Sequence, residues 1–363
     1  MILVWAMYRI CFVITDALSF NVLCRGQFEY FKAARLGEMT FLCGGDKRQI
    51  DYLKRRRVGL VQQIPFVRKP NLPVDIFCFF YLLVFFIRNR FDLVIYSTPK
   101  ALLLSSLATF IARVPNRIAL VRGRVYENFS GVKKNLFKLL DKVAFALSTN
   151  ILFISKSLMQ AYRHDRVIGN QMGVVLGSGS SNGVDKKLFY PGSDFLFDRL
   201  RPFHVVSVGR ICADKGIIEL VAVIAGVNRR CNSAQIKFTV VGHIEDLAAI
   251  EAVKELKKYN NVQIIPFTAQ VADVFRSANL HLFLSRREGF GNVALEAAAC
   301  GVPTFAFDVV GVRDSVSEES GKLFNFGDVD SIVESVIIAA KDGDAFKNKY
   351  INMTRWAYNN YDS

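Results

Sequence analysis

The amino-acid sequence predicts an α/β protein of two doubly wound domains. Its 363 residues exceed what one ordinary hydrophobic core organises, so about two domains are expected. Hydrophobic residues make up 52% of the chain and charged residues 22%, which excludes large-scale disorder. Apolar, strand-like runs alternate with helical stretches in both halves of the chain. This alternation is typical of right-handed βαβ units around a parallel sheet.

The first domain is expected to span residues 1–190. Short apolar runs predict strands, and longer stretches with helical spacing of apolar side chains predict helices. The expected strands are 10–15, 40–43, 93–96, 117–121 and 151–154, and the expected helices are 27–35, 49–57, 101–112 and 133–147. Loop-forming residues are densest at 177–183 and 190–194, which indicates the end of this domain.

The second domain is expected to span residues 200–345, where the alternation starts again. The expected strands are 204–208, 237–241, 262–265 and 280–284. One helix is expected to begin at Gly216, and two more are expected at 248–259 and 331–340. Two doubly wound domains that face each other bind ligands at the carboxyl ends of their strands. The expected binding site is therefore the cleft between the domains.

The stretch at residues 285–304 predicts a ligand-binding corner, because a buried strand is followed there by a glycine loop and a helix. Gly289 and Gly291 let a ligand approach the backbone, and the helix N-terminus favours an anion such as phosphate. Glu288 and Glu296, as ionised carboxylates, accept hydrogen bonds from hydroxyl groups. Together these features predict a sugar nucleotide, whereas the loop alone fits a simple chain turn equally well.

Two cations are expected at the same edge of the second sheet. Arg210 follows the first strand of this domain and Lys215 precedes the next helix, so both should lie near Glu288. Together they can hold a diphosphate without a metal. Asp328 and Asp330 could suggest a metal site, but they precede a helix and are better explained as its N-cap and first turn. The four histidines lack the spacing of metal ligands.

The net charge of +15 lies in the first half of the chain. Residues 1–200 contain 29 Lys and Arg against 13 Asp and Glu, whereas residues 201–363 contain 18 against 19. Such an asymmetry indicates a polyanionic partner, either nucleic acid or an anionic membrane surface. No module that interleaves aromatic and basic residues for nucleic acid is found, so the membrane surface is preferred.

One apolar run, at residues 76–87, is shorter than the roughly 20 residues that span a bilayer. It is predicted to be a buried helix, with a helix lying in the membrane interface as the alternative. Seven scattered cysteines lack metal or redox spacing, and no signal peptide is convincing. The protein is therefore expected in the cytoplasm.

Two sets of motifs point to one family. The second domain carries Gly-Arg at 209–210, Lys-Gly at 215–216, Glu-Gly-Phe-Gly-Asn-Val-Ala-Leu-Glu-Ala at 288–297 and Gly-Val-Pro at 301–303. The first domain carries Arg-Gly-Gln at 25–27, Ser-Thr-Pro-Lys-Ala at 97–101, Arg-Gly at 122–123 with Glu127, and residues 179–185 with Phe189. These motifs resemble the family 4 retaining glycosyltransferases of the GT-B fold, in which two Rossmann-like domains face each other across a cleft. The motifs of the second domain are the more specific, because Glu288 and Glu296 are separated by seven residues.

The resemblance implies a metal-independent hexosyltransferase without a cofactor. In it, Arg210 and Lys215 would contact the donor diphosphate and Glu288 the hydroxyls of the donor sugar, as the catalytic residues. The implied nucleotide-binding residues are Glu296 on the ribose, Gly291, Asn292 and Val293 through their backbone, Gly26 near the phosphates, and Phe267 in the base pocket. Arg122 and Glu127 are assigned to the acceptor side, although many relatives have a histidine there and this chain has none.

The subgroup that the chain resembles extends polyprenyl-diphosphate-linked sugars for bacterial surface polysaccharides such as O-antigen and capsule. The implied donor is UDP-N-acetylgalactosamine or a related UDP-N-acetylhexosamine. The enzyme would be peripheral on the inner face of the cell membrane, with residues 55–57 and 133–134 as candidate contacts. The tail at 346–363 would return to the first domain. A basic nucleic-acid- or membrane-binding protein without transferase activity is the alternative.

Overall fold

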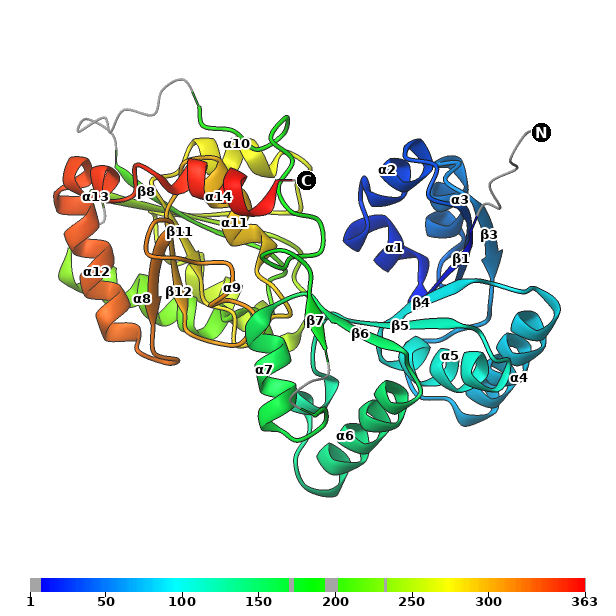
Figure 1. Cartoon of the computed structure of the whole chain (residues 1–363). Helices are drawn as coiled ribbons and strands as arrows, with labels where there is room; N and C mark the ends of the chain where they lie inside the picture. The colour runs from blue at the N-terminus through cyan, green and yellow to red at the C-terminus, as the bar shows by residue number, and fades with distance from the viewer. Residues whose placement is uncertain (1–7, 170–172, 193–201, 232–233, 363) are drawn as a thin grey trace. The chain divides into compact units, whose positions relative to one another are not determined.

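The computed structural model describes residues 8–169, 173–192, 202–231 and 234–362. The chain divides into two compact units, Met1–Asn182 and Gly183–Ser363. The division falls within the first loop-rich segment that the sequence indicated and before the second. Each unit contains one parallel sheet with helices on both faces (Figure 1).

The first unit contains a seven-stranded sheet in the order β3-β2-β1-β4-β5-β6-β7. The strands are β1 (Arg9–Asp16), β2 (Glu38–Gly44), β3 (Leu60–Gln63), β4 (Leu93–Ser97), β5 (Asn116–Val121), β6 (Asn150–Phe153) and β7 (Val174–Val175). All neighbouring strands pair in parallel. The five expected strands are present, and the short strands β3 and β7 were not predicted.

The helices of the first unit cover both faces of this sheet. They are α1 (Ala17–Leu23), α2 (Gln27–Ala33), α3 (Lys47–Arg55), α4 (Leu72–Arg88), α5 (Pro99–Ile111), α6 (Gly131–Ala146) and α7 (Lys156–His164), with a 3-10 turn η1 (Val125–Asn128). Helices α1 to α3 lie on one face, and α4 to α6 lie side by side on the other (Figure 1). Such an arrangement is the doubly wound fold that the alternating pattern predicts.

Aromatic side chains fill the core between β1, β2 and the first two helices. Phe12, Phe28 and Phe41 contact one another with ring centroids 4.6 to 5.4 Å apart. Phe20 packs edge-on against two of them. Large rings in such edge-to-face contacts anchor α1 and α2 to the sheet. The end of α1 and the start of α2 are therefore held at the carboxyl edge of β1.

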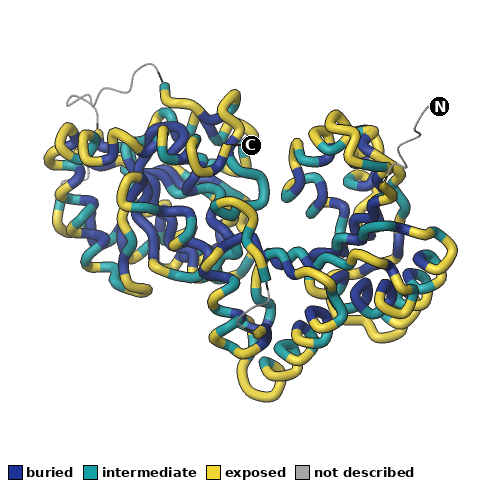
Figure 2. Tube along the Cα trace, in the orientation of Figure 1, coloured by how far each residue is buried: buried dark blue, intermediate teal, exposed yellow. Residues whose placement is uncertain are grey.

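Helix α4 confirms the helix expected from the apolar run at 76–87. Only one of its faces is covered by the fold: Cys78, Leu82 and Phe86 are buried, whereas large apolar side chains on the opposite face are exposed (Figure 2). The helix is thus buried on one side and open on the other. Within the described ranges, every helix is too short or too polar to span a lipid bilayer.

The second unit contains a six-stranded sheet in the order β10-β9-β8-β11-β12-β13. The strands are β8 (Phe203–Val208), β9 (Ile236–Val241), β10 (Val262–Ile265), β11 (Leu280–Phe283), β12 (Thr304–Phe307) and β13 (Gly321–Phe324). The helices are α8 (Ile217–Arg230), α9 (Leu247–Leu256), α10 (Val271–Arg276), α11 (Asn292–Ala299), α12 (Val329–Lys341), α13 (Gly343–Lys349) and α14 (Met353–Tyr361), with a 3-10 turn η2 (Ala213–Lys215). All pairs are parallel, and the order changes direction between β8 and β11. A ligand site is expected at the carboxyl ends of these two strands.

The described part of the C-terminal tail, residues 346–362, lies in the second unit. The expected return of the tail to the first domain stays a prediction. Helix α14 packs on α11, and the Tyr361 hydroxyl donates a hydrogen bond to the Asp314 carbonyl over 2.8 Å. The tail therefore supports the helix that follows the glycine loop. The interpretation of Asp328 as an N-cap is confirmed, because its carboxylate accepts a hydrogen bond from the Ser331 amide.

Candidate functional site

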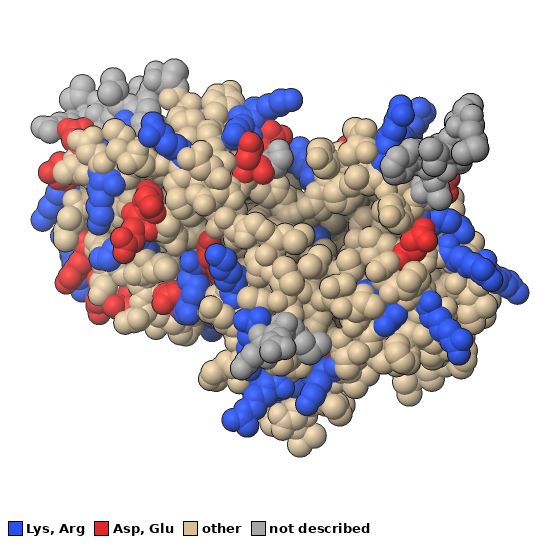
Figure 3. Space-filling model, viewed as in Figure 1, with Lys and Arg blue, Asp and Glu red and all other residues tan. Residues whose placement is uncertain are grey.

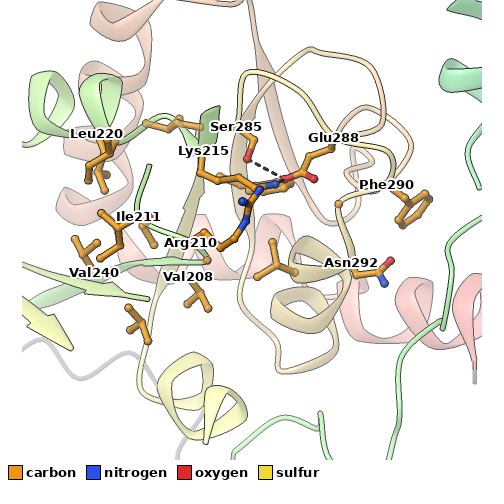
Figure 4. Close-up of a pocket in the computed structure, with 18 residues that line it drawn as sticks. Val208, Arg210, Ile211, Lys215, Leu220, Val240, Ser285, Glu288, Phe290 and Asn292 are labelled. Atoms are coloured by element: carbon orange, nitrogen blue, oxygen red, sulfur yellow. Dashed lines mark hydrogen bonds and ion pairs between the residues drawn. The ribbon is translucent and has the colours of Figure 1, made fainter. Parts of the chain in front are cut away.

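A cavity of about 260 Å³ opens at the carboxyl ends of β8, β9 and β11 (Figure 4). It lies where the strand order changes direction, which is the place that the doubly wound fold predicts. Its lining residues are Ser207, Val208, Gly209, Arg210, Ile211, Lys215, Ile217, Leu220, Val240, Val241, Phe283, Leu284, Ser285, Glu288, Phe290, Gly291, Asn292 and Val293. Six predicted site residues, from two segments far apart in the sequence, thus line one cavity.

The turn η2 approaches the end of β11 closely because of one glycine. Gly216 has a φ of 78°, a left-handed conformation, and a Cβ built on it would lie 1.9 Å from the Leu284 carbonyl oxygen. A side chain at this position would both strain the backbone and overlap the neighbouring strand. Gly216 therefore permits the contact that brings Lys215 beside the loop after β11.

Lys215 and Glu288 form an ion pair inside the cavity. The Ser285 hydroxyl donates a second hydrogen bond to the same carboxylate over 3.0 Å, and Figure 4 shows Lys215 and Arg210 pointing toward Glu288. The two side chains of the pair are 21% and 15% exposed, so the pair is shielded from bulk water. The Lys215 ammonium, a charged hydrogen-bond donor, and the Glu288 carboxylate, a hydrogen-bond acceptor, thus lie side by side. A diphosphate-linked sugar needs the first for its phosphates and the second for its hydroxyls.

Arg210 lies nearer to solvent than Lys215. Its guanidinium pairs with the Glu245 carboxylate over 2.6 Å, and the side chains are 55% and 40% exposed. Burial acts against the charge, but Glu245 and then Glu288 raise the pKa of Arg210 above its ordinary value. Glu245 was not predicted from the sequence, because it follows β9 rather than the strand that Arg210 follows. Its role as the partner of Arg210 follows only from the fold.

Two further ion pairs hold the loop at 285–288 against η2 and α8. Arg286 pairs with Glu219 over 2.7 Å, and Arg287 pairs with Asp214. The Arg286 amide also donates to the Asp214 carbonyl over 3.0 Å. These contacts fix the spacing between the two expected phosphate-binding corners. Sequence reasoning missed them, because opposite charges 67 and 73 residues apart in the chain leave no local signal of their contact.

Helix α11 starts at the cavity, with Gly291 as its N-cap, and no side chain of the described residues caps it. The side chain of Asn292 points away from Glu288 in Figure 4. The first-turn amides and the helix dipole favour an anion at this end. Gly291 also meets a packing need, since a Cβ on it would lie 2.5 Å from Phe283 and Ser315 side-chain atoms. Glu296 is half-buried on α11 and is not among the residues that line the cavity.

Phe267 lies outside this cavity. It follows β10, its side chain is 66% exposed, and its ring stacks on His243 with centroids 5.3 Å apart and planes nearly parallel. His243 follows the neighbouring strand β9, so both rings lie at the same edge of the sheet as the cavity. The assignment of Phe267 to a base pocket remains a prediction, and His243 is an addition that the sequence did not suggest.

In the first unit, three of the motifs meet at the carboxyl edge of the sheet. Arg122 follows β5, and its guanidinium donates to the Ser181 hydroxyl over 2.6 Å and lies 3.4 Å from the Cys24 sulfur. The Gln27 side chain donates to the Ser181 carbonyl. Gly26, the N-cap of α2, has a φ of 79°, and no atom lies within 4 Å of a Cβ built on it. Its backbone is accessible, as a phosphate contact requires.

Glu127 belongs to a different cluster from Arg122. It pairs with Arg124, whose guanidinium also contacts the Asp165 carboxylate over 3.1 Å. Lys138 binds the same carboxylate over 3.0 Å. The two residues expected on the acceptor side are therefore not partners, and Glu127 helps to fix the turn η1 on α6 and α7. Burial lowers the pKa of Arg122 below its ordinary value. Their acceptor roles stay predictions.

Metal-ligating side chains do not gather in the described ranges: no group of three or more His, Cys, Asp or Glu residues is placed to hold an ion. The cations that line the cavity are protein side chains, Arg210 and Lys215. Both can neutralise phosphate oxygens directly. The two cations and the Glu288 carboxylate are thus suited to a phosphorylated, hydroxyl-rich ligand.

Comparison with known proteins places this geometry in context. Residues 197–360 match the family model for glycosyl transferases group 1. The capsular polysaccharide biosynthesis glycosyltransferase CapM of Staphylococcus aureus is 30% identical over 322 residues, covering 86% of this chain and 83% of the relative.

Two more distant proteins are also similar. The N,N'-diacetylbacillosaminyl-diphospho-undecaprenol alpha-1,3-N-acetylgalactosaminyltransferase of Campylobacter jejuni is 23% identical over 254 residues, 66% of this chain and 65% of the relative. The crystal structure of Anabaena HepE in complex with UDP superposes with a TM-score of 0.75 at 21% identity, over 98% of this chain and 96% of that chain. The superposition shows that the two chains share a fold.

Proposed function

Because the chain belongs to the group 1 glycosyl transferases, we propose that it moves an N-acetylhexosamine from a UDP-sugar to a polyprenyl-diphosphate-linked saccharide, with retention of configuration. The family, the GT-B fold class and the enzyme class predicted from the sequence are confirmed. The alternative of a basic binding protein without transferase activity is at odds with this family membership.

The observation that carries the proposal is the Lys215–Glu288 pair in the donor cavity. Lys215 supplies the charge that a diphosphate needs, and the Glu288 carboxylate accepts hydrogen bonds from sugar hydroxyls. Arg210 lies beside them, and the start of α11 borders the same cavity. One end of the ligand is thus anionic and the other rich in hydroxyls, which describes a nucleotide sugar.

The reaction follows from these charges. As the bond between the anomeric carbon and the diphosphate oxygen breaks, negative charge develops on the leaving group. Arg210, Lys215 and the N-terminus of α11 stabilise that charge as it forms, which lowers the barrier. The acceptor oxygen forms the new bond to the anomeric carbon from the same face, and its proton passes to the departing phosphate oxygen. We expect no metal ion in this step.

The similar proteins support the choice of substrates. HepE was crystallised with UDP, which supports a uridine nucleotide as the donor. The name of the Campylobacter relative describes an N-acetylgalactosaminyltransferase that acts on an undecaprenyl-diphosphate sugar. The Staphylococcus relative is a capsular polysaccharide enzyme. We therefore favour UDP-N-acetylgalactosamine as the donor and a surface polysaccharide as the product.

A lipid-linked acceptor implies contact with the inner face of the cell membrane. On the face that Figure 3 shows, Lys and Arg of the first unit have few acidic side chains among them, whereas both charges are interspersed over the second unit. Among the candidate contacts, Arg55, Arg57 and Lys133 are exposed. Arg56 does not fit the expectation, because its side chain is only 9% exposed and pairs with Glu29 over 2.7 Å. Arg56 stabilises the fold of the first unit instead.

Calorimetric titration of UDP, GDP and NAD in EDTA tests the donor site. We expect UDP to bind without metal, and Glu296→Ala to weaken binding about 10- to 100-fold, because a hydrogen bond to a charged group is worth roughly 1.5–3 kcal/mol. Glu251→Ala is the matched control, since Glu251 lies on α9 in an exposed pair with Lys254. UDP binding that needs a divalent ion, or no nucleotide binding at all, contradicts the proposal.

Retention is checked by NMR of the anomeric configuration of the product.

A further inference from the structure

Helix α4 is apolar on the side that the fold leaves open. Six large side chains on that side are between 44% and 73% exposed: Leu72, Ile76, Phe77, Phe80, Val84 and Ile87. The charged residues of this 17-residue helix are Asp75 and Arg88, and Asp75 is bound to Lys100 over 2.6 Å. A helix that is apolar all round is normally covered all round. A contiguous exposed apolar surface of this kind marks an interaction site.

This surface continues into a groove at the amino ends of β1, β2 and β3. One cavity of about 570 Å³ is lined by Phe77, Phe80 and Val84 of α4. A second cavity of about 710 Å³ adjoins it, since both are lined by Arg9, Thr40, Leu60 and Phe91. We call the two cavities and the exposed side of α4 the α4 groove. The groove lies at the edge of the sheet opposite the carboxyl ends that carry Gly26 and Arg122, so it is separate from them.

The far end of the α4 groove is cationic. Arg9, Lys32, Arg35 and Arg57 line it, and Glu38 is the acidic side chain in the same lining. Among the described residues, Arg35 and Arg57 are exposed and form no ion pair, which leaves both guanidinium groups available. Arg9 lies over the Phe91 ring, 5.2 Å from its centroid, and so links the cationic end to the apolar end. Positive charge next to an apolar surface is the complement of an anionic amphiphile.

The direction of α4 connects the groove to the sheet edge where the acceptor residues are expected. Its C-terminal end leads into β4 at the amino edge. Its N-terminal end is tied by Asp75 to Lys100, which lies in the first turn of α5, just after β4, and therefore at the carboxyl edge. A surface that runs along α4 thus extends from the cationic groove to the edge that carries Arg122. A lipid held in that surface would reach this edge from the membrane.

We propose that the α4 groove docks the first unit onto a bilayer that contains anionic lipid, with Phe77 and Phe80 among the acyl chains and Arg35 and Arg57 on headgroup phosphates. The proposal rests on the proposed function, which places the acceptor in a membrane. A bilayer is favoured over a protein partner because the apolar and cationic parts are adjacent and extended along one helix. The orientation follows: α4 lies parallel to the membrane plane.

Sedimentation of the full chain with vesicles tests the docking. Wild-type protein is expected to bind phosphatidylglycerol vesicles, and Phe80→Asp with Val84→Asp to reduce that binding at least tenfold. These two side chains are exposed, so their replacement leaves the core of the unit intact. Arg35→Glu with Arg57→Glu is expected to reduce binding to phosphatidylglycerol vesicles and to leave the weaker binding to phosphatidylcholine vesicles unchanged. The first pair reports on acyl contact, and the second on headgroup charge.

The controls carry the same changes outside the groove. Ile338→Asp alters an exposed apolar residue on α12, and Arg229→Glu reverses an exposed charge on α8; both are expected to bind vesicles like wild type. UDP titration of every variant separates this proposal from the donor site, because α4 variants should keep UDP affinity. Vesicle binding that is absent in wild type, or unchanged in both α4-groove pairs, overturns the docking. A second outcome also overturns it. If light scattering shows that the wild type is a dimer, and Phe80→Asp with Val84→Asp makes it a monomer that still binds vesicles, then a second copy of the chain covers α4.

Discussion

At the residue scale, the two expected phosphate ligands differ in how firmly the protein holds them. The Lys215–Glu288 pair is mostly shielded, whereas the Arg210–Glu245 pair is about half exposed. Exposed ion pairs contribute only about 0–1 kcal/mol. Arg210 can therefore leave Glu245 for a diphosphate at little cost. Lys215 is already in place beside the carboxylate that we assign to the donor sugar.

A buried carboxyl group in the first unit predicts an unusual pH dependence of stability. Burial raises the pKa of Asp141 from 3.8 to about 6, although a hydrogen bond from Tyr162 partly opposes the shift. A raised folded-state pKa means that stability is highest below the unfolded value and falls as pH rises through 6. We expect Asp141→Asn to stabilise the protein at pH 8 by up to about 3 kcal/mol, since one pKa unit is worth 1.36 kcal/mol. Urea unfolding between pH 5 and pH 8 measures the difference, which should shrink toward pH 5.

Asp165 provides the control of opposite sign. Burial acts to raise its pKa, but hydrogen bonds from Lys138 and Tyr126 lower it below the ordinary value. Its contribution to stability is thus present at neutral pH and is lost as pH falls through the lowered pKa. Asp165→Asn should therefore destabilise the protein at pH 8. If both variants shift stability in the same direction at pH 8, burial is not the cause of the Asp141 effect.

At the element scale, the contact between η2 and the end of β11 depends on the absence of a side chain at Gly216. We expect Gly216→Ala to destabilise the protein by about 3 kcal/mol, from left-handed strain and overlap with Leu284. Gly327→Ala is the matched control, because Gly327 has a φ of 84° and no atom lies within 4 Å of a Cβ built on it. It should cost about 1 kcal/mol from the backbone alone.

Urea midpoints and UDP titration separate the two glycine variants. Gly216→Ala should also weaken UDP binding, because Lys215 would move with the displaced turn. Gly327→Ala should leave UDP affinity unchanged. Equal losses of stability would show that the close approach to Leu284 has no energetic weight.

The two edge strands of the first sheet could not be predicted from sequence patterns. Strand β3 is the four-residue segment Leu60–Gln63, which ends in two glutamines, and β7 is only the pair Val174–Val175. Neither has the apolar run that identified β1 or β4. Both form because their neighbours offer an unpaired edge, which no local pattern encodes. The five expected strands of this sheet, by contrast, each pair with a neighbour on both sides.

At the scale of the whole molecule, each unit has its own hydrophobic core, and the excess of positive charge lies in residues 1–200. We expect UDP to slow hydrogen exchange at residues 208–216 and 285–293 of the second unit, because these segments line the donor cavity. Helix α4 should respond to phosphatidylglycerol vesicles and not to UDP. Hydrogen exchange followed by mass spectrometry measures both responses in one preparation. Protection of α4 by UDP alone would contradict the separation of the two sites.

The sequence by itself determined the features that depend on local pattern. The alternation of strands and helices predicted two doubly wound units, and the motifs around Arg210 and Glu288 identified the family. The segments that line the donor cavity were also predictable, because the carboxyl ends of parallel strands must share one edge. The apolar character of α4 was evident as well. Each of these features depends on residues that are close together in the sequence.

Only the tertiary structure decided which distant side chains meet. It paired Arg210 with Glu245, buried Arg56 against Glu29, separated Glu127 from Arg122 and brought the C-terminal tail onto α11. It also left one apolar side of α4 open, although composition favoured a buried helix. The physical reason is common to all of these. Burial and ion pairing depend on the packing of elements far apart in the chain, which local propensity and periodicity do not encode.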